Sequence, residues 1–375
     1  MMSTQGTQRG RLAIVGAGVI GMSCAWRAAE TGWSVELIDP APGSGSSWVA
    51  GGMLAPVTEA WPGEEELLDL GADSLQGWPA FAGALAEASG REPGLRTEGT
   101  VVVAAAAGDR AELDDLADYL AKLDRAVDRL TGRELRKLEP AIGPDVRGGI
   151  SVPGDLAVDN RLLLAALRAA CERAGVGFVE ATVDRVEDGV RLTDGRRVEA
   201  DVVLIAAGAH SAALHPLLAG RVRPVKGEIL RLRQRPGALP PPSRTVRAVV
   251  DGRPVYAVPR DDGGLVIGAT QYETGFDTEP TVGGVRDLLR DAERVLPGIA
   301  EYTLAEVAAG LRPGTPDNLP LIGELADGVL VATGHGRNGM LLAPVTVATV
   351  LALLNSEPVP TTAKVADPGR PRGKG

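Results

Sequence analysis

Cysteine, histidine and aromatic residues are scarce in this chain of 375 residues. Its two cysteines, Cys24 and Cys171, are too few for a disulfide framework or a cysteine-based zinc site. Three histidines, His210, His215 and His335, lie far apart and show no metal-ligand spacing. Aromatic residues make up only 3% of the chain. We therefore expect no metal centre and no disulfide framework.

Long apolar runs and an excess of positive charge are missing as well. The segment Leu12–Trp26 follows two arginines, as in a signal peptide, but three glycines interrupt it and it is too short to span a bilayer. The net charge is −10 and the pI is about 5.0, which argues against nucleic acid or an anionic membrane as the main partner. We expect a cytoplasmic protein with neither kind of partner.

The order of expected elements indicates an α/β fold with interleaved domains. Strand and helix patterns alternate at first, as in Arg11–Val15, Met22–Thr31 and Ser34–Ile38, whereas 222–270 shows the alternation and turns of antiparallel sheet. We expect a discontinuous nucleotide-binding domain and a β-rich substrate domain of α+β type, with residues 357–375 as a disordered tail. The nucleotide domain takes 8–85, 150–220 and 306–356, and the substrate domain takes 86–149 and 221–305. Further helices are expected at 73–89, 109–123, 160–174, 283–295 and 341–354.

The sequence VGAGVIG directly follows the first strand and opens the first helix. Gly16 permits a tight turn, Gly18 lets the backbone approach a pyrophosphate at the helix N-terminus, and Gly21 lets helix and strand pack closely. Asp39 ends the second strand, where a carboxylate can accept hydrogen bonds from both ribose hydroxyls of an adenosine. This pattern predicts a dinucleotide site, and the acid favours FAD or NAD over NADP.

A second glycine-containing loop, PGSGSSWVAGGMLAP, follows at 42–56. Ser46 and Ser47 offer hydroxyl groups to a second phosphate, and Gly51, Gly52 and Met53 would let the backbone approach a planar ring closely. The alternative is a flexible surface loop, which its apolar residues argue against. The loop therefore favours FAD over NAD.

Six segments together resemble the glycine oxidase branch of the D-amino acid oxidase superfamily, in family order over about 11–354. They are VGAGVIG, SSWVAGGMLAP, RPVKGE, YAVPR, GLRPGTPDNLPLIG and GHGRNGMLLAP. The resemblance implies a Rossmann-like FAD-binding domain interleaved with a mostly antiparallel β-sheet substrate domain. The FAD would be noncovalent, because the cysteine that tethers flavin in related sarcosine oxidases has no counterpart after Cys171.

The resemblance also assigns the flavin contacts. They fall on residues of the two glycine-containing turns, on the end of the second strand and on a turn near the C-terminus, where backbone amides can stabilise negative charge at the flavin edge. With the three motif glycines, these cofactor residues are Val19, Ile20, Asp39, Pro40, Ser46, Ser47, Gly51, Gly52, Met53, Val183, Gly208, His335, Gly336, Arg337, Asn338, Gly339, Met340 and Leu341.

The resemblance also assigns the substrate carboxylate to Arg312, assisted by Tyr256 and Arg337. An arginine between Leu311 and Pro313 in an apolar segment is a poor surface charge, and its planar guanidinium can bind a carboxylate bidentately. The alternatives are a structural ion pair for Arg312, a core tyrosine for Tyr256 and a flavin-edge role for Arg337. Pro254 stands where the relatives have a polar side chain, which leaves the exact substrate open.

The activity implied by the resemblance is oxidation of glycine, and of sarcosine or small D-amino acids, by hydride transfer to flavin N5. The products would be glyoxylate or another 2-oxo acid, ammonia and, with O2 as acceptor, hydrogen peroxide. In bacteria this points to thiazole formation in thiamine biosynthesis, with a homotetramer and hand-over of the imine to thiazole synthase as expected partners. The alternatives are a D-amino acid oxidase or dehydrogenase, or another flavin amine oxidase or demethylase.

Overall fold

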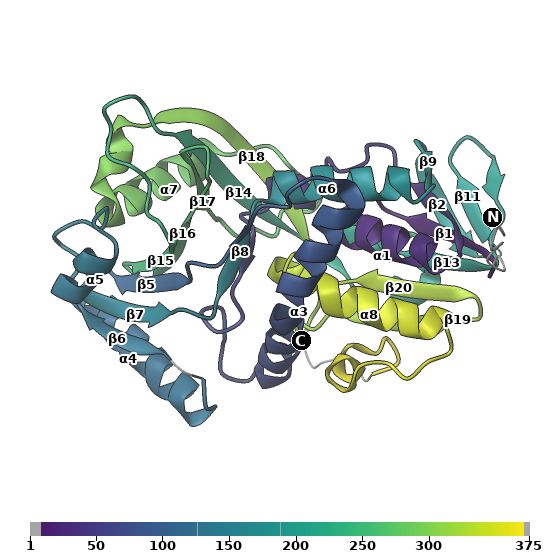
Figure 1. Cartoon of the computed structure of the whole chain (residues 1–375), viewed down its shortest axis with the longest axis horizontal. Coiled ribbons are helices and arrows are strands. Elements are labelled where there is room, and N and C mark those ends of the chain that lie inside the picture. Colours follow the sequence, from purple (N-terminus) through teal and green to yellow (C-terminus); the bar gives the residue numbers. More distant parts are fainter. Residues whose placement is uncertain (1–8, 126, 188, 371–375) are drawn as a thin grey trace, which may run out of the picture.

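A computed structural model describes residues 9–125, 127–187 and 189–370 and shows two large sheets, one in each half of the molecule (Figure 1). The purple strands β1 and β2 lie in one half, and the green strands β14 and β17 lie in the other. The chain passes between the halves several times, because both sheets collect strands from distant parts of the sequence. The expected α/β fold with interleaved parallel and antiparallel sheets is confirmed.

The first sheet has six strands in the order β19-β20-β13-β1-β2-β9. All neighbours are parallel except β19, which runs antiparallel to β20 at one edge. Along β1, Leu12 and Ile14 pack against the helices α1, α3, α6 and α8, whereas Ala13 and Val15 pack against the small sheet β10-β11-β12. Both faces of the strand are therefore covered, as its continuous apolar sequence predicts. The six strands are β1 (Arg11–Val15), β2 (Ser34–Ile38), β9 (Gly177–Val179), β13 (Val202–Ile205), β19 (Leu321–Ala326) and β20 (Val329–Thr333).

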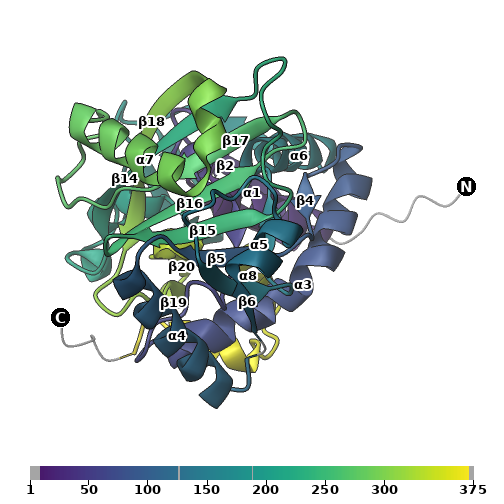
Figure 2. The same cartoon turned by 90° about the vertical axis from the view of Figure 1, so that its left-hand side faces the viewer.

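The second sheet has eight strands in the order β18-β14-β17-β16-β15-β5-β7-β6. Its pairs are antiparallel apart from β15 and β5. Helix α7 packs on one of its faces, as the view from that end shows (Figure 2). The strands are β5 (Thr100–Ala104), β6 (Asp128–Thr131), β7 (Gly148–Val152), β14 (Arg223–Arg233), β15 (Thr245–Val250), β16 (Arg253–Pro259), β17 (Gly264–Gly268) and β18 (Thr303–Gly314).

Two small sheets, eight α-helices and five short 3-10 helices complete the described chain. The small sheets contain β3 (Met53–Leu54), β4 (Leu95–Arg96) and β8 (Leu156–Val158), and β10 (Val183–Glu187), β11 (Gly189–Leu192) and β12 (Arg197–Val198). The helices are α1 (Val19–Glu30), α2 (Ser46–Val49), α3 (Glu65–Ser89), α4 (Ala107–Lys122), α5 (Gly132–Leu138), α6 (Asn160–Arg173), α7 (Val282–Val295) and α8 (Ala343–Leu354). No described helix has the length and apolarity needed to cross a bilayer.

The prediction that residues 357–375 form a disordered tail is wrong for residues 357–370, which the structure describes. Residues Thr361–Ala366 form a 3-10 helix in which Ala363 and Ala366 are buried, and Arg370 forms an ion pair with Asp317 at 3.0 Å. The segment packs through small alanine side chains, which give only a weak hydrophobic signal in a polar and proline-rich sequence. Its composition therefore did not indicate this packing. Residues 371–375 of the expected tail lie outside the described part of the chain.

The proposed domain boundaries cross two strands of the second sheet. The boundary before residue 150 cuts β7, and the boundary before residue 306 cuts β18, although both strands pair within the eight-stranded sheet. We therefore place both strands with the substrate domain in the proposed division.

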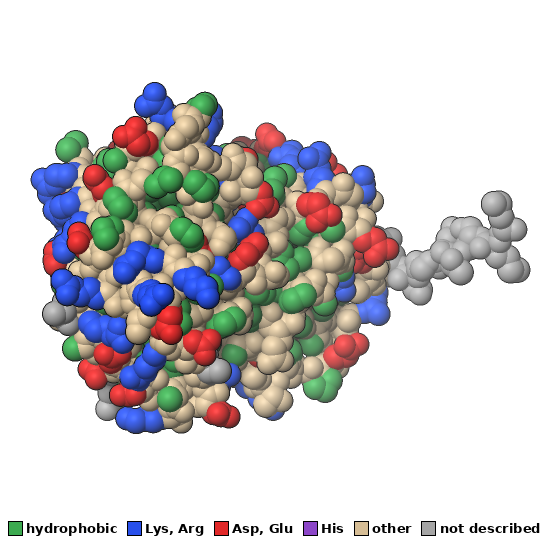
Figure 3. Space-filling view, turned by 60° about the vertical axis from the view of Figure 1, so that its left-hand side comes forward, with side chains coloured by type: hydrophobic (Ala, Val, Ile, Leu, Met, Phe, Trp, Pro, Cys, Tyr) green, Lys and Arg blue, Asp and Glu red, His purple; other side chains and the backbone are tan. Residues whose placement is uncertain are grey.

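On the face drawn in Figure 3, lysine and arginine side chains are interspersed with aspartate and glutamate.

Candidate active site

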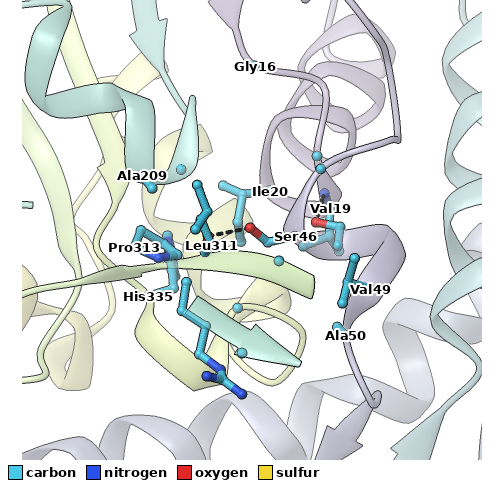
Figure 4. A pocket seen from close by; sticks show the side chains of 18 of the residues that line it. Gly16, Val19, Ile20, Ser46, Val49, Ala50, Ala209, Leu311, Pro313 and His335 are labelled. Atoms are coloured by element: carbon cyan, nitrogen blue, oxygen red, sulfur yellow. Dashed lines mark hydrogen bonds between the residues drawn. The ribbon is translucent and has the colours of Figure 1, made fainter. Parts of the chain in front are cut away.

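A cavity of about 840 Å³ lies at the junction of the two sheets. The glycine turn after β1, the loop around α2, the strands β16 and β18 and the turn after β20 all line it. Figure 4 shows Gly16, Val19 and Ile20 beside the cavity, with Ser46 meeting Leu311 of β18 and with His335 nearby. Segments from the beginning, middle and end of the sequence thus line one cavity.

Steric constraints explain the glycines of the first turn. Gly16 has φ +105°, and a Cβ atom there would lie 2.5 Å from the carbonyl oxygen of Ala206. A Cβ on Gly21 would lie 1.8 Å from the carbonyl oxygen of Gly16. Neither position can therefore hold a larger residue without moving the backbone. Gly21 does not line the cavity but lets α1 approach β1, as predicted.

Asp39 ties this turn to the end of β2. One carboxylate oxygen accepts a hydrogen bond from the amide of Ala17 at 2.7 Å, and the other accepts one from the amide of Ala41 at 2.8 Å. Asp39 and the neighbouring Pro40 both line the cavity. The carboxylate is thereby held in a fixed position at the place where the motif predicts a ribose.

The loop around α2 is held by its two serines. The Ser47 hydroxyl accepts a hydrogen bond from the Val19 amide at 3.0 Å, at the N-terminus of α1, and the Ser46 hydroxyl donates to the Leu311 carbonyl oxygen. Both serines line the cavity. Their hydroxyl groups thus join the glycine turn, the α2 loop and β18, in addition to the predicted role beside a phosphate.

Glycines also bring the loop against the aromatic ring of Tyr256. A Cβ on Gly51 would lie 2.7 Å from this ring, and a Cβ on Gly52 would lie 2.0 Å from the Val158 carbonyl oxygen. Gly51, Gly52 and Met53 line the cavity together. The surface-loop alternative is wrong for these residues, because both glycines are buried.

Arg312 projects from β18 across Gly227 of the neighbouring strand. The position of a Cβ on Gly227 lies 2.3 Å from Nη1 of Arg312, so only glycine leaves room for the guanidinium. Its single hydrogen bond within the described chain runs from Nη1 to the Thr270 carbonyl oxygen at 3.2 Å. The alternative of a structural ion pair finds no partner, since no described carboxylate lies within 4.0 Å of it. Arg312 is thus a half-buried cation in the cavity, available to an anionic ligand.

Tyr256 lies close to this cation. Burial raises the pKa of Tyr256, and the charge of Arg312 opposes the rise without reversing it. The phenol is therefore neutral near pH 7 and can donate a hydrogen bond. Its hydroxyl group has no hydrogen-bond partner among the residues that the structure describes, so the donor is free for a ligand.

Two further charged residues of the cavity were missed by the sequence analysis. Arg247 lies opposite Tyr256 in the pairing of β15 and β16 and forms an ion pair of 2.8 Å with Glu59. Both line the cavity. A charged residue in the apolar strand sequence TVRAVV was the available signal for Arg247.

The third predicted substrate residue, Arg337, also lines the cavity, but it donates to the Glu59 carbonyl oxygen at 3.2 Å and to Glu64 at 2.8 Å. Its charge is therefore already matched by the protein.

The turn after β20 contributes His335, Gly336, Arg337, Gly339 and Met340 to the lining. Burial lowers the pKa of His335 to about 3, and its Nε2 atom lies 3.0 Å from the Thr346 hydroxyl. The ring is therefore neutral and does not act as an acid or base near pH 7.

Two predicted cofactor residues of the same turn, Asn338 and Leu341, do not line the cavity. Both are buried, and the Leu341 carbonyl oxygen accepts hydrogen bonds from Ser74 at 2.7 Å and Trp78 at 3.0 Å. They support the turn from behind. Val183 and Gly208 lie on the cavity wall, together with His210, whose ring stacks on Phe276 with 4.8 Å between centroids.

Comparisons with known proteins agree with this geometry. The family model described as "FAD dependent oxidoreductase" (DAO) matches residues 11–353. The glycine oxidase of Pseudomonas aeruginosa is 33% identical over 376 residues, which cover 96% of this chain and 99% of that protein. The bifunctional protein ThiO/ThiG of Synechocystis is 32% identical over 358 residues, or 92% of this chain. The chain spans about half of that relative, 52% of its length.

Solved structures resemble the whole chain as well. The crystal structure of glycine oxidase from Geobacillus kaustophilus has a TM-score of 0.88 at 31% identity and covers 97% of this chain and 100% of its own. The iminodiacetate oxidase of Chelativorans has a TM-score of 0.83 at 27% identity, covering 96% and 99%. Both similarities extend over nearly the whole chain and thus over the segments that form the two large sheets.

Proposed function

Because the chain belongs to the DAO family of FAD-dependent oxidoreductases, we propose that it oxidises glycine, with sarcosine and small D-amino acids as further substrates. The observation that carries this proposal is the guanidinium of Arg312, which enters the cavity without a carboxylate partner in the described chain. Glycine oxidases among the similar proteins support the same substrate.

The residues present fit FAD. The turn at Gly16 is a cradle that a Cβ atom would close, and the N-terminus of α1 behind it favours a pyrophosphate. The Asp39 carboxylate would bind the ribose, and residues 51–53, 335–337, 339 and 340 would surround the flavin ring. When bound, FAD supplies the acceptor for two electrons from the substrate, and O2 then takes them to form hydrogen peroxide.

Arg312 would bind the substrate carboxylate, and Tyr256 would donate a hydrogen bond to it. A charge-assisted bond of this kind contributes about 1.5–3 kcal/mol net. Arg337 would then act at the edge of the site, because Glu59 and Glu64 already engage it. The chain thus orients the amino acid, and such positioning accounts for much of catalysis in an enzyme that relies on its cofactor for electron transfer.

The substrate amine must lose a proton before its carbon is oxidised. His335 is a poor acceptor for this proton, because burial lowers its pKa to about 3 and its Nε2 atom faces the Thr346 hydroxyl. Lysine is absent from the described lining of the cavity. We infer that the proton leaves to water, and that the product imine hydrolyses to a 2-oxo acid and ammonia, with glyoxylate as the product from glycine.

The test is a substrate panel with the purified flavoprotein. Glycine, sarcosine, D-alanine and iminodiacetate are supplied in air without an added acceptor, and hydrogen peroxide is measured against substrate consumed. One peroxide per glycine is the expected result. Turnover only with a quinone acceptor would show a dehydrogenase instead, and turnover of D-alanine without glycine would show a D-amino acid oxidase.

We also propose that the enzyme works in the cytoplasm in thiamine biosynthesis, as a homotetramer that hands its imine to thiazole synthase. Two relatives described as bifunctional proteins ThiO/ThiG support the link to thiazole synthase, because this chain matches only about half of each and a second function resides in the same polypeptide. Sedimentation of the purified protein tests the tetramer. Cross-linking to the thiazole synthase of the same organism tests the hand-over.

A further inference from the structure

In the peptide group between Gly51 and Gly52, the carbonyl oxygen has a hydrogen-bond partner in the described chain but the N–H group does not. The Gly51 carbonyl oxygen accepts a hydrogen bond from Nη2 of Arg260 at 2.7 Å. The next carbonyl oxygen, that of Gly52, accepts one from the amide of Val158 at 2.8 Å. Both carbonyl groups therefore point into the protein.

The N–H group of Gly52 must then point the other way. The Gly51–Gly52 peptide is trans, and in a trans peptide the N–H and C=O groups point in opposite directions. Gly52 is buried and lines the cavity, and its N–H group has no acceptor within the described chain. A buried amide without a partner loses free energy unless a ligand supplies the acceptor. The geometry thus presents one N–H donor to whatever fills the cavity at this point.

Two consecutive glycines would not maintain that orientation by themselves. Gly52 has φ +84°, and glycine adopts positive and negative φ with similar ease. The peptide can therefore rotate by half a turn without a steric penalty from side chains, which would direct the Gly51 carbonyl oxygen into the cavity. The hydrogen bond from Arg260 opposes this rotation, because rotation would break it.

Arg260 is itself held firmly. Its side chain is 5% exposed and forms an ion pair of 3.2 Å with Asp159, and Nη2 also lies 3.3 Å from Oδ1 of Asn160. Asn160 is fully buried. Its amide group donates to the carbonyl oxygens of Ser47 and Trp48, both at 2.8 Å. Arg260 and Asn160 thus hold three carbonyl groups of the same loop from behind.

We propose that Arg260 is a positioning residue that keeps the Gly52 N–H group directed at the flavin, with Asn160 holding the rest of the loop. The inference rests on the proposed function in one respect, namely that the flavin ring lies beside residues 51–53. A fixed N–H donor stabilises the negative charge that the flavin gains on reduction, whereas a carbonyl oxygen in the same place opposes it. Arg260 therefore acts on the cofactor through the loop, without touching it.

The test compares Arg260→Met with Arg231→Met in the full chain loaded with FAD. Arg231 is the matched control, because it is a neighbouring half-buried arginine that donates to the Trp48 carbonyl oxygen and to Asn160 but not to Gly51. The midpoint potential of the flavin and the dissociation constant of FAD are measured. We expect Arg260→Met to lower the potential and to weaken FAD binding about tenfold or more, as for a lost bond to a charged group. Arg231→Met should change both much less.

Further variants make the outcome decisive. Arg260→Lys keeps a charged donor and should restore most of the potential. Should Arg260→Met fail to fold, Arg260→Gln takes its place, because its shorter side chain cannot reach both Asp159 and Gly51. Equal potentials in the wild type and the Arg260 variant, or equal shifts in the Arg260 and Arg231 variants, would overturn the proposal. A wild-type protein that binds no FAD would instead overturn the proposed function.

Discussion

Replacing Arg312 by alanine removes the one cavity guanidinium that has no protein carboxylate within 4.0 Å in the described chain. A charge-assisted bond to a carboxylate contributes about 1.5–3 kcal/mol, and each 1.4 kcal/mol corresponds to a factor of ten. The KM for glycine should therefore rise by about 10- to 150-fold. The only hydrogen bond lost within the described chain is the one of 3.2 Å to the Thr270 carbonyl oxygen, so the fold should persist.

The assay is steady-state peroxide formation over a range of glycine concentrations, with flavin absorbance near 450 nm measured on the same samples. Arg223→Ala is the matched control, because Arg223 lies in the strand beside Arg312 but pairs at the surface with Glu273 at 3.1 Å. Its KM should equal that of the wild type. The Arg312 variant should remain yellow and lose affinity for glycine.

The substitution Arg312→Lys tests whether positive charge alone, or the planar guanidinium as well, is needed to bind the substrate carboxylate. An ammonium group keeps the charge but cannot form the two parallel bonds of a guanidinium. We expect an intermediate KM. If Arg312→Ala bound glycine as well as the wild type, the assignment of this residue to the substrate carboxylate would be refuted. If the variant lost its flavin as well, Arg312 would have a structural role instead.

Three further perturbations follow from the geometry. Gly16→Ala should abolish FAD binding, because its Cβ would lie 2.5 Å from the Ala206 carbonyl oxygen at φ +105°; a yellow variant would contradict this. Burial raises the pKa of Asp155 from 3.8 to about 7, so the native state holds a proton that the unfolded chain releases at lower pH. The free energy of unfolding should thus fall as pH rises from about 4 to about 7, and denaturant titrations of Asp155→Asn should lack this slope. Deleting residues 361–375 exposes the apolar surface that Ala363 helps to cover and breaks the ion pair of Arg370, so the melting temperature should fall by several degrees; an unchanged value would exclude a structural role for the segment.

The parts of the fold that were predicted from the sequence depend on local patterns. The strand Arg11–Val15 and the strand Ser34–Ile38 have the predicted bounds, because continuous apolar residues bounded by glycine are a strong signal. Helix α1 begins at Val19, three residues earlier than expected at Met22. The expected start treated 16–21 as one turn, whereas Gly18 already serves as the N-cap.

The site residues that were missed depend on contacts between distant segments. Arg247 is one charged residue among many in the sequence, and only the pairing of β15 with β16 places it beside Tyr256. Glu59 follows a loop whose path the sequence does not define. Arg260 was part of the motif YAVPR, but its contact with Gly51 spans 209 residues. Such contacts leave no local periodicity, so pattern analysis could not identify them.

The repeated passage of the chain between the two sheets has a consequence for experiments. Strand β18 belongs to one sheet and the next strand, β19, belongs to the other, and segments of both halves line the cavity. Retention of the cofactor should therefore report on the whole native state, and ligand linkage should raise the stability of both halves together. Flavin release during heating and loss of tertiary structure should coincide in one transition.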